Sequence, residues 1–323
     1  MKSLLKRFIV PLICLFILLF VFFNANNWSN FLMKYTLNDP KIKEPSSNNY
    51  KKNYDFLFVQ NVTNFMPFSF GDLKNIYFTI VNHGWKEFTF YCPSEYINCL
   101  DDVKKLSNDQ DLLTHLNNYV HPYNSFSNVK TVINESGEIT VSIEYFYTEE
   151  QEDIINKKVD EIYNSIINDN MDLYTKILTI HDYIINNTKY DVTRNNEGNS
   201  IYKSYIAYGP LIEGYATCNG YTDAMALFLE KLNVPNFKVA MTPDENSDTE
   251  GHVWNAVLID NKWLHLDLTW DDPVSSDGTD YLQHKYFLIT TNQLEEADTS
   301  GEVKVTEHQF KPTFYPELKK QEN

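Results

Sequence analysis

Residues 213–221 read Glu-Gly-Tyr-Ala-Thr-Cys-Asn-Gly-Tyr, and the prediction of the fold starts from this segment. We predict that Thr217 caps a helix over residues 218–232, because the apolar side chains that follow it recur at helical spacing. Cys218 then lies in the first turn, where unpaired backbone N–H groups and the positive end of the helix dipole stabilise a thiolate. The same N–H groups can receive an oxyanion, so Cys218 is the candidate nucleophile.

Two strands joined by a tight turn are predicted after this helix. Residues 252–259 and 262–269 have strand-like patterns, and Asp260-Asn261 between them suits a two-residue hairpin turn. In this register His252 and Asp267 lie diagonally on one face of the sheet, roughly 7–8 Å apart at the backbone and within side-chain reach. A slip of one residue would put them on opposite faces.

Three segments together resemble the core of the transglutaminase-like superfamily, particularly its bacterial members. They are the stretch quoted above, Gly-His-Val-Trp-Asn at residues 251–255, and His-Leu-Asp-Leu-Thr-Trp-Asp-Asp-Pro at residues 265–273. Upstream, His-Asp-Tyr-Ile at residues 181–184 and Lys-Tyr-Asp at residues 189–191 resemble the helix and loop that precede the nucleophile in that group. The resemblance covers residues 144–288, somewhat under half of the chain.

The resemblance implies an α+β, papain-like fold and a catalytic Cys-His-Asp triad carried by Cys218, His252 and Asp267. The superfamily includes cross-linking transglutaminases, peptidases, deglycosylating amidases and members without catalysis, so it leaves the reaction open. We expect thiol-dependent acyl transfer or hydrolysis at amide bonds of a protein or peptide substrate, such as one at the cell surface. The alternative is an extracellular binding or scaffold protein that keeps the fold without turnover.

Each candidate also has a structural interpretation. A cysteine near a helix start is more often a small buried hydrophobe, and a histidine on a strand more often makes a structural hydrogen bond. The two residues together, in these contexts, favour catalysis. His265 shares the predicted face of Asp267, where it either competes for the same space or, as we expect, packs or hydrogen-bonds structurally. Trp254 is interpreted either as a core residue or as a wall of the substrate groove.

An oxyanion site also needs a second donor beside the backbone N–H of Cys218. Ile212, six residues before the nucleophile, has no hydrogen-bonding side chain. We therefore expect Tyr208 to serve as a substitute donor.

Composition bounds the possible partners of this 323-residue chain. Its 43% hydrophobic and 15% aromatic content supplies ample core, and its net charge of −17 argues against nucleic-acid binding. No Cys/His spacing resembles a zinc site, and the aspartates around Pro273 do not match the twelve-residue calcium loop. We expect neither a metal nor a cofactor.

The N-terminus carries a candidate membrane segment. Lys2, Lys6 and Arg7 precede an uncharged apolar run over residues 8–23, which suits a signal peptide or a short membrane anchor. A small-x-small cleavage pattern does not follow, so we predict an uncleaved anchor at residues 1–28, with the rest of the chain outside the cell. The alternative is a cleaved, secreted product.

Three further segments follow the anchor. Residues 29–53 are expected to form an extended stalk, residues 54–147 a small α+β domain, and residues 148–323 the transglutaminase-like catalytic domain. The small domain either binds substrate or a wall component, or is a spacer packed on the catalytic unit.

Within these domains we predict strands at residues 76–81, 87–91 and 285–289 and a helix at residues 109–119. A hairpin is predicted over residues 129–147, and a capping box at Thr148 predicts a further helix. Cys92 and Cys99 either close a disulfide loop or stay as free thiols, depending on the oxidising power of the compartment.

Overall fold

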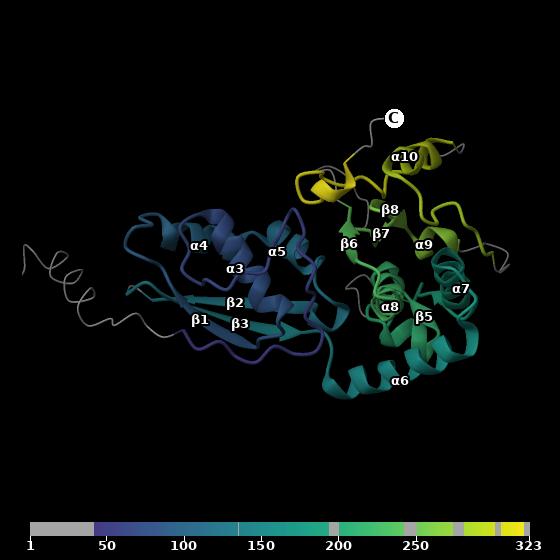
Figure 1. The fold of residues 1–323 in the computed structure, drawn as a ribbon, viewed down its shortest axis with the longest axis horizontal. Coiled ribbons are helices and arrows are strands. Elements are labelled where there is room, and N and C mark those ends of the chain that lie inside the picture. The colour runs from purple at the N-terminus through teal and green to yellow at the C-terminus, as the bar shows by residue number, and fades with distance from the viewer. Residues whose placement is uncertain are drawn as a thin grey trace, which may run out of the picture.

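The computed structural model describes residues 42–134, 136–193, 200–241, 251–273, 281–300 and 305–319. Within these ranges the chain has an α+β architecture with two antiparallel three-stranded sheets, ordered β1-β3-β2 and β6-β7-β8 (Figure 1). The first part contains α3 (Phe70–Asn82), β1 (Glu87–Tyr91), α4 (Cys99–Asn108), α5 (Gln110–Asn117), β2 (Phe126–Ile133) and β3 (Glu138–Tyr145). Helices α3, α4 and α5 cover one face of its sheet (Figure 1).

The second part begins with two helices and ends with the other sheet and a helix. Its elements are α6 (Glu149–Ile166), α7 (Leu173–Asn186), β4 (Lys189–Tyr190), the short helix η2 (Gly209–Glu213), β5 (Tyr215–Ala216), α8 (Cys218–Lys231), β6 (Asn236–Ala240), β7 (Val253–Ile259), β8 (Lys262–Leu266), α9 (Leu268–Asp271) and α10 (Thr291–Thr299). Thr148 and Gln151 form the predicted capping box at the start of α6.

The predicted strand at residues 76–81 is wrong, because this segment lies inside α3. The Ser69 hydroxyl accepts the Asp72 N–H at the helix start, which the strand prediction overlooked. Every residue from Ile76 to Asn82 is buried, so α3 has no polar face to reveal the helical period there. By contrast, β1 has the predicted bounds and α5 lies within its predicted range.

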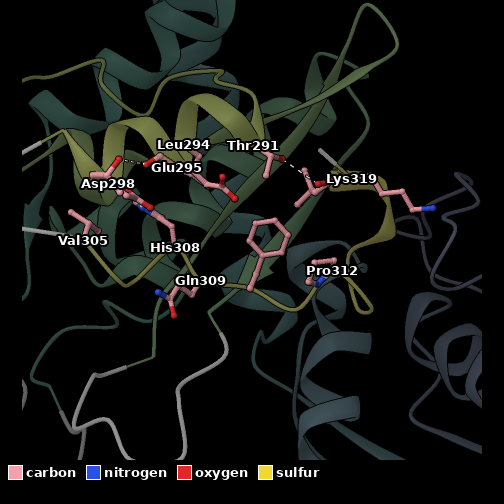
Figure 2. Close-up of a pocket in the computed structure, with 12 residues that line it drawn as sticks. Thr291, Leu294, Glu295, Asp298, Val305, His308, Gln309, Pro312 and Lys319 are labelled. Atoms are coloured by element: carbon pink, nitrogen blue, oxygen red, sulfur yellow. Dashed lines mark hydrogen bonds and ion pairs between the residues drawn. The ribbon is translucent and has the colours of Figure 1, made fainter. Parts of the chain in front are cut away.

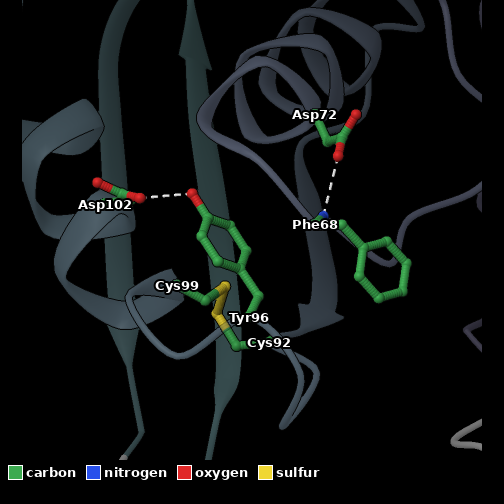
Figure 3. Close-up of a disulfide and its surroundings, with 6 residues drawn as sticks. All are labelled: Phe68, Asp72, Cys92, Tyr96, Cys99 and Asp102. Atoms are coloured by element: carbon green, nitrogen blue, oxygen red, sulfur yellow. Dashed lines mark hydrogen bonds between the residues drawn. A yellow bond between two sulfur atoms is a disulfide. The ribbon is translucent and has the colours of Figure 1, made fainter.

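Cys92 and Cys99 form a disulfide, which decides between the two alternatives left open by the sequence (Figure 3). It joins the end of β1 to the first residue of α4. In the same turn the Tyr96 hydroxyl donates to the Asp102 carboxylate (Figure 3). The loop between β1 and α4 is therefore fixed by a covalent bond as well as by a hydrogen bond.

The last part of the expected stalk packs on the body of the protein, which corrects that prediction for residues 48–52. The Lys52 ammonium is buried, donates to the Asn236 carbonyl at 2.7 Å and pairs with Glu230 at 3.0 Å. Tyr50 stacks on His121, with ring centroids 4.9 Å apart. Composition suggested a solvated segment, but the second part of the chain supplies partners for its polar groups.

The expected anchor at residues 1–28, with its apolar run at residues 8–23, lies outside the described residues. In the part of the chain that the structure describes, no helix has the length and apolarity needed to cross a membrane.

The β7–β8 hairpin has the predicted register. Ile259 pairs with Lys262 across Asp260-Asn261, and both turn residues have positive φ, as a type I′ turn requires. The pairing ends at Asn255 and Leu266, so β8 is shorter than the predicted strand of residues 262–269. The strand predicted at residues 285–289 is also wrong, since only Ile289 makes a bridge, to His265.

One hydrophobic core crosses the expected domain boundary at residue 148. Phe237 of β6 packs on Phe56 and Tyr119, with ring centroids 5.6 and 4.8 Å away. Tyr315, near the end of the described chain, joins the same buried group. The first part is therefore packed on the second through apolar side chains.

Candidate active site

Cys218 is the first residue of α8 and is partly exposed. The residues that follow it, from Asn219 to Leu229, are all buried, so this helix lies inside the second part of the molecule. Neighbouring elements that contact α8 include β7 and α7. A cysteine at this position is held by a rigid element with its thiol at the edge of the core.

The loop before the nucleophile is tied to the start of α8. The Thr217 N–H donates to the Ser204 carbonyl at 2.9 Å, and the Asn219 side-chain amide donates to the Tyr205 carbonyl at 2.7 Å. The expected side-chain cap by Thr217 is wrong, because its hydroxyl donates to Ser204 instead. Gly220 permits this approach, since a Cβ there would lie 2.1 Å from the Ser204 carbonyl oxygen.

His252 immediately precedes β7 and is buried. Its Nε2 lies 2.5 Å from Oδ2 of Asp267, so Nδ1 is the ring nitrogen that remains for another partner. Burial disfavours the charged ring, but the Asp267 carboxylate and a hydrogen bond with Cys218 outweigh it and raise the pKa of His252 to about 10. The imidazole is therefore charged at neutral pH and is able to stabilise a thiolate or to donate a proton.

Asp267 is buried and is the N-cap of α9, which is why β8 ends one residue before it. Its Oδ1 accepts the Thr269 and Trp270 N–H groups at 2.8 and 3.2 Å. Its Oδ2 accepts hydrogen bonds from His252 and from His308, the latter at 3.0 Å. Burial alone would raise the pKa of Asp267, but the charge and hydrogen bond of His252, with the hydrogen bond of His308, keep it well below its usual range.

His308 is the residue of this cluster that the sequence did not reveal. It is buried in the irregular segment of residues 305–319, and its Nδ1 lies 2.8 Å from Oδ1 of Asp298 in α10. Burial disfavours its charge, but hydrogen bonds to Asp267 and Asp298 raise the pKa of His308. A lone histidine outside any periodic pattern carries no sequence signal of such a contact.

The sequence also indicated Trp254 as a candidate groove residue and Tyr208 as a candidate oxyanion donor. Trp254 is fully buried, so its interpretation as a groove wall is wrong. Its indole N–H donates to His265 Nδ1 at 2.9 Å, and its ring stacks on His252. His265 is thus engaged by Trp254 and leaves the place beside His252 to Asp267. The Tyr208 ring lies under the Lys203 ammonium at 4.2 Å, and its role as an oxyanion donor stays a prediction.

Among the described residues, two groups have ligand atoms close enough to share one metal ion: His252 with Asp267 and His308, and His181 with Asp182 and His284. In both groups the ring nitrogens already lie against carboxylate oxygens, as with His181 and Asp182 at 2.9 Å. Both groups are networks of hydrogen bonds and ion pairs between histidine rings and carboxylates.

Residues 160–268 match the family model of the transglutaminase-like superfamily, so the chain carries a transglutaminase-like domain that contains Cys218, His252 and Asp267. No curated protein matches the chain. A solved structure described as a TGase is 18% identical, with a TM-score of 0.30, and the match covers 45% of each chain. A candidate cysteine protease from Cytophaga hutchinsonii is 14% identical, with a TM-score of 0.29, over 48% of this chain and 65% of that one.

Proposed function

We propose that the transglutaminase-like domain of residues 160–268 catalyses thiol-dependent acyl transfer or hydrolysis at amide bonds of proteins or peptides. Cys218 is the nucleophile, His252 the acid and base, and Asp267 the group that orients the imidazole. The observation that carries the proposal is the buried His252–Asp267 hydrogen bond of 2.5 Å, together with the interaction with Cys218 that helps to raise the pKa of the same ring.

The chemistry follows from these positions. The Cys218 thiolate attacks the amide carbonyl carbon, and the new C–S bond gives a tetrahedral oxyanion at the N-terminus of α8, where backbone N–H groups lack acceptors within the helix. The His252 imidazolium gives its proton to the amide nitrogen, the C–N bond breaks and an amine leaves. Water or a second amine then attacks the thioester carbonyl and gives a proton to His252, the C–S bond breaks and the Cys218 thiolate is released. Water gives hydrolysis and the amine gives cross-linking.

Acylation of Cys218 by p-nitrophenyl acetate tests the enzyme class. The wild-type chain is expected to form an acetyl thioester at Cys218, and His252→Ala should slow its formation at least about 100-fold, because the base that ionises the thiol is lost. Peptide-resolved mass spectrometry identifies the acylated cysteine. His284→Gln, at a half-exposed histidine outside the triad, is the matched control and should react as the wild type does.

Two results would count against the proposal. Equal acylation rates in the wild type and His252→Ala would leave Cys218 an ordinary thiol and favour a scaffold protein. Acylation at other residues in preference to Cys218 would exclude it as the nucleophile.

A transferase and a hydrolase differ in the molecule that attacks the Cys218 thioester, which is an amine in the first and water in the second. A glutamine-containing peptide incubated with and without a primary amine should give an amine adduct in the first case, and only free acid or cleaved peptide in the second. Product masses measure this directly.

An outer cell-surface location belongs to the same proposal. It is supported by the apolar run at residues 8–23 and by the Cys92–Cys99 disulfide, a bond that persists in oxidising spaces. A membrane-impermeant thiol reagent should label Cys218 in intact cells that express the full chain. Labelling only after lysis would contradict this location.

A further inference from the structure

His308 lies between two carboxylates that come from different elements. Its Nε2 is 3.0 Å from Oδ2 of Asp267, the cap of α9, and its Nδ1 is 2.8 Å from Oδ1 of Asp298, on α10. Its side chain has no exposed surface, with a relative exposure of 0%. Carboxylates only accept hydrogen bonds when ionised, so an imidazole that bonds to both must carry a proton on each nitrogen.

The hydrogen bonds form a continuous chain from the triad to α10. His252 bonds to Asp267, Asp267 to His308 and His308 to Asp298, and the interaction with Cys218 helps to raise the pKa of His252 at the start of this chain. With both histidines charged, the signs alternate along these hydrogen bonds. The His308 imidazolium is then flanked by two carboxylates, which is the arrangement that stabilises a charge away from water.

We propose that His308 is a positioning residue of the active site, which stays an imidazolium between Asp267 and Asp298 and fixes both the orientation and the charge of Asp267. It acts on the reaction through Asp267 and does not touch the substrate. The inference rests on the proposed triad, since it assigns His308 a role toward the residue that orients His252.

The titratable groups near the His308 ring affect whether the ring is charged. Two other histidine rings are near it: His252, whose centroid is 5.5 Å away, and His265, which is kept neutral because burial and the charge of His308 lower its pKa to about 3. Tyr286 packs on the His308 ring at 4.7 Å, and burial raises the pKa of its hydroxyl, so it stays neutral. Within the described ranges, Asp267 and Asp298 are the charged groups that bond to the ring.

The Asp298 end of this chain reaches a cavity. His308 and Asp298 line a space of about 560 Å³ beneath α10, together with apolar side chains such as Leu294 and Phe310 (Figure 2). Figure 2 shows the His308 ring beside the Asp298 carboxylate at the wall of this cavity. The Asp298 carboxylate thus lies near water, while Asp267 is shielded in the core.

A titration of the histidine rings tests the charge of His308 without any substrate. In full-length protein labelled with ¹⁵N-histidine, both ring nitrogens of His308 should show imidazolium chemical shifts at pH 8, and His308→Gln identifies the signals. Asp298→Asn should lower the titration midpoint by at least about one pH unit, because one stabilising charge is removed. A His308 that is neutral at pH 7 in the wild type would overturn the proposal.

The effect on the nucleophile is measured by alkylation. The rate at which iodoacetamide modifies Cys218, followed by peptide-resolved mass spectrometry, should rise with pH in both proteins. In His308→Gln its midpoint should lie about one pH unit higher, because a positive charge near the triad is lost while an amide N–H remains to bond Asp267. An unchanged midpoint would overturn the positioning role.

The matched control is His115→Gln, which alters another buried histidine, far from the triad, that bonds to Tyr315. It should lower Tm and leave the midpoint of Cys218 alkylation unchanged, so that destabilisation and electrostatics are told apart. Alkylation needs no turnover. If acylation of Cys218 leads to no product but both measurements succeed, the proposed function fails and the role of His308 stands.

Discussion

At the scale of single residues, the site depends on the positive charge of the His252 imidazole, which burial disfavours. Removing His252 from water would lower its pKa, yet the Asp267 carboxylate and the hydrogen bond with Cys218 raise it to about 10. Because this value lies above the unfolded pKa near 6.5, the contribution of His252 to stability is fully present below pH 6.5. It is lost as the pH rises through about 10. Stability and readiness for catalysis therefore depend on the same hydrogen bond.

Replacing Asp267 with Asn should remove the charge that holds the His252 proton. Burial is then no longer offset, so the pKa of His252 should fall below 7 and the imidazolium should be largely absent at pH 8. We expect alkylation of Cys218 by iodoacetate, an anion that favours a thiolate–imidazolium pair, to slow by more than about 10-fold at pH 8.

Asp271→Asn is the control for this change, because Asp271 is an equally buried aspartate whose Oδ2 lies near His181 and not near His252. It should leave the rate of Cys218 alkylation within about 2-fold of the wild type. A similar loss in both variants would mean that any buried aspartate in α9 supports the site, and that the His252–Asp267 hydrogen bond has no special role.

At the scale of elements, one close packing sets the position of the nucleophile. The loop that contains Ser204 lies directly against the start of α8, where Gly220 offers no side chain. The Thr217 N–H and the Asn219 amide hold this loop in place. The position of Cys218 therefore depends on a contact that a single methyl group would disturb.

Gly220→Ala should displace this loop. A methyl group would lie 2.1 Å from the Ser204 carbonyl oxygen and 3.3 Å from the Ala216 Cβ, so we expect a loss of about 1–3 kcal/mol in the free energy of unfolding. Gly71→Ala in α3 is the matched control, because its nearest atom, the Ser69 hydroxyl, is 3.6 Å away. That variant should be neutral or gain up to about 1 kcal/mol from helix propensity. Urea titrations measure both, and equal effects would contradict the packing argument.

The sequence predicted those elements whose turn or capping residues lie next to one another along the chain. The turn at Asp260-Asn261 fixed the register that brings His252 to Asp267, since both residues tolerate positive φ. The capping box at Thr148 gave the start of α6 for a similar reason. Buried α3 was missed, because a helix surrounded by core at residues 76–82 shows no polar face. His308 was missed because its partners lie 10 and 41 residues away along the chain, where no local pattern links them.

At the scale of the whole molecule, Tyr315 connects the end of the described chain to the first part. Its hydroxyl accepts the side-chain amide of Asn118 at 2.7 Å and the backbone N–H of Ala240 at 2.8 Å. It also lies 2.7 Å from Nδ1 of His115, whose pKa burial lowers to about 4. His115 is thus neutral at pH 7, and its Nδ1 accepts the Tyr315 O–H. Three bonds at one hydroxyl join α5, β6 and the C-terminal segment.

Tyr315→Phe should weaken this junction and, with it, the whole fold. The ring still fills its place beside Phe237, but two buried N–H groups and His115 lose their partner, which should cost about 1–3 kcal/mol. Because one hydrophobic core spans both parts, we expect a single unfolding transition at a lower Tm, seen together by tryptophan fluorescence and by far-UV circular dichroism. Tyr174→Phe, at an exposed ring, should leave Tm unchanged. Two separate transitions in Tyr315→Phe would show instead that the first part folds independently and that the shared core contributes little to cooperativity.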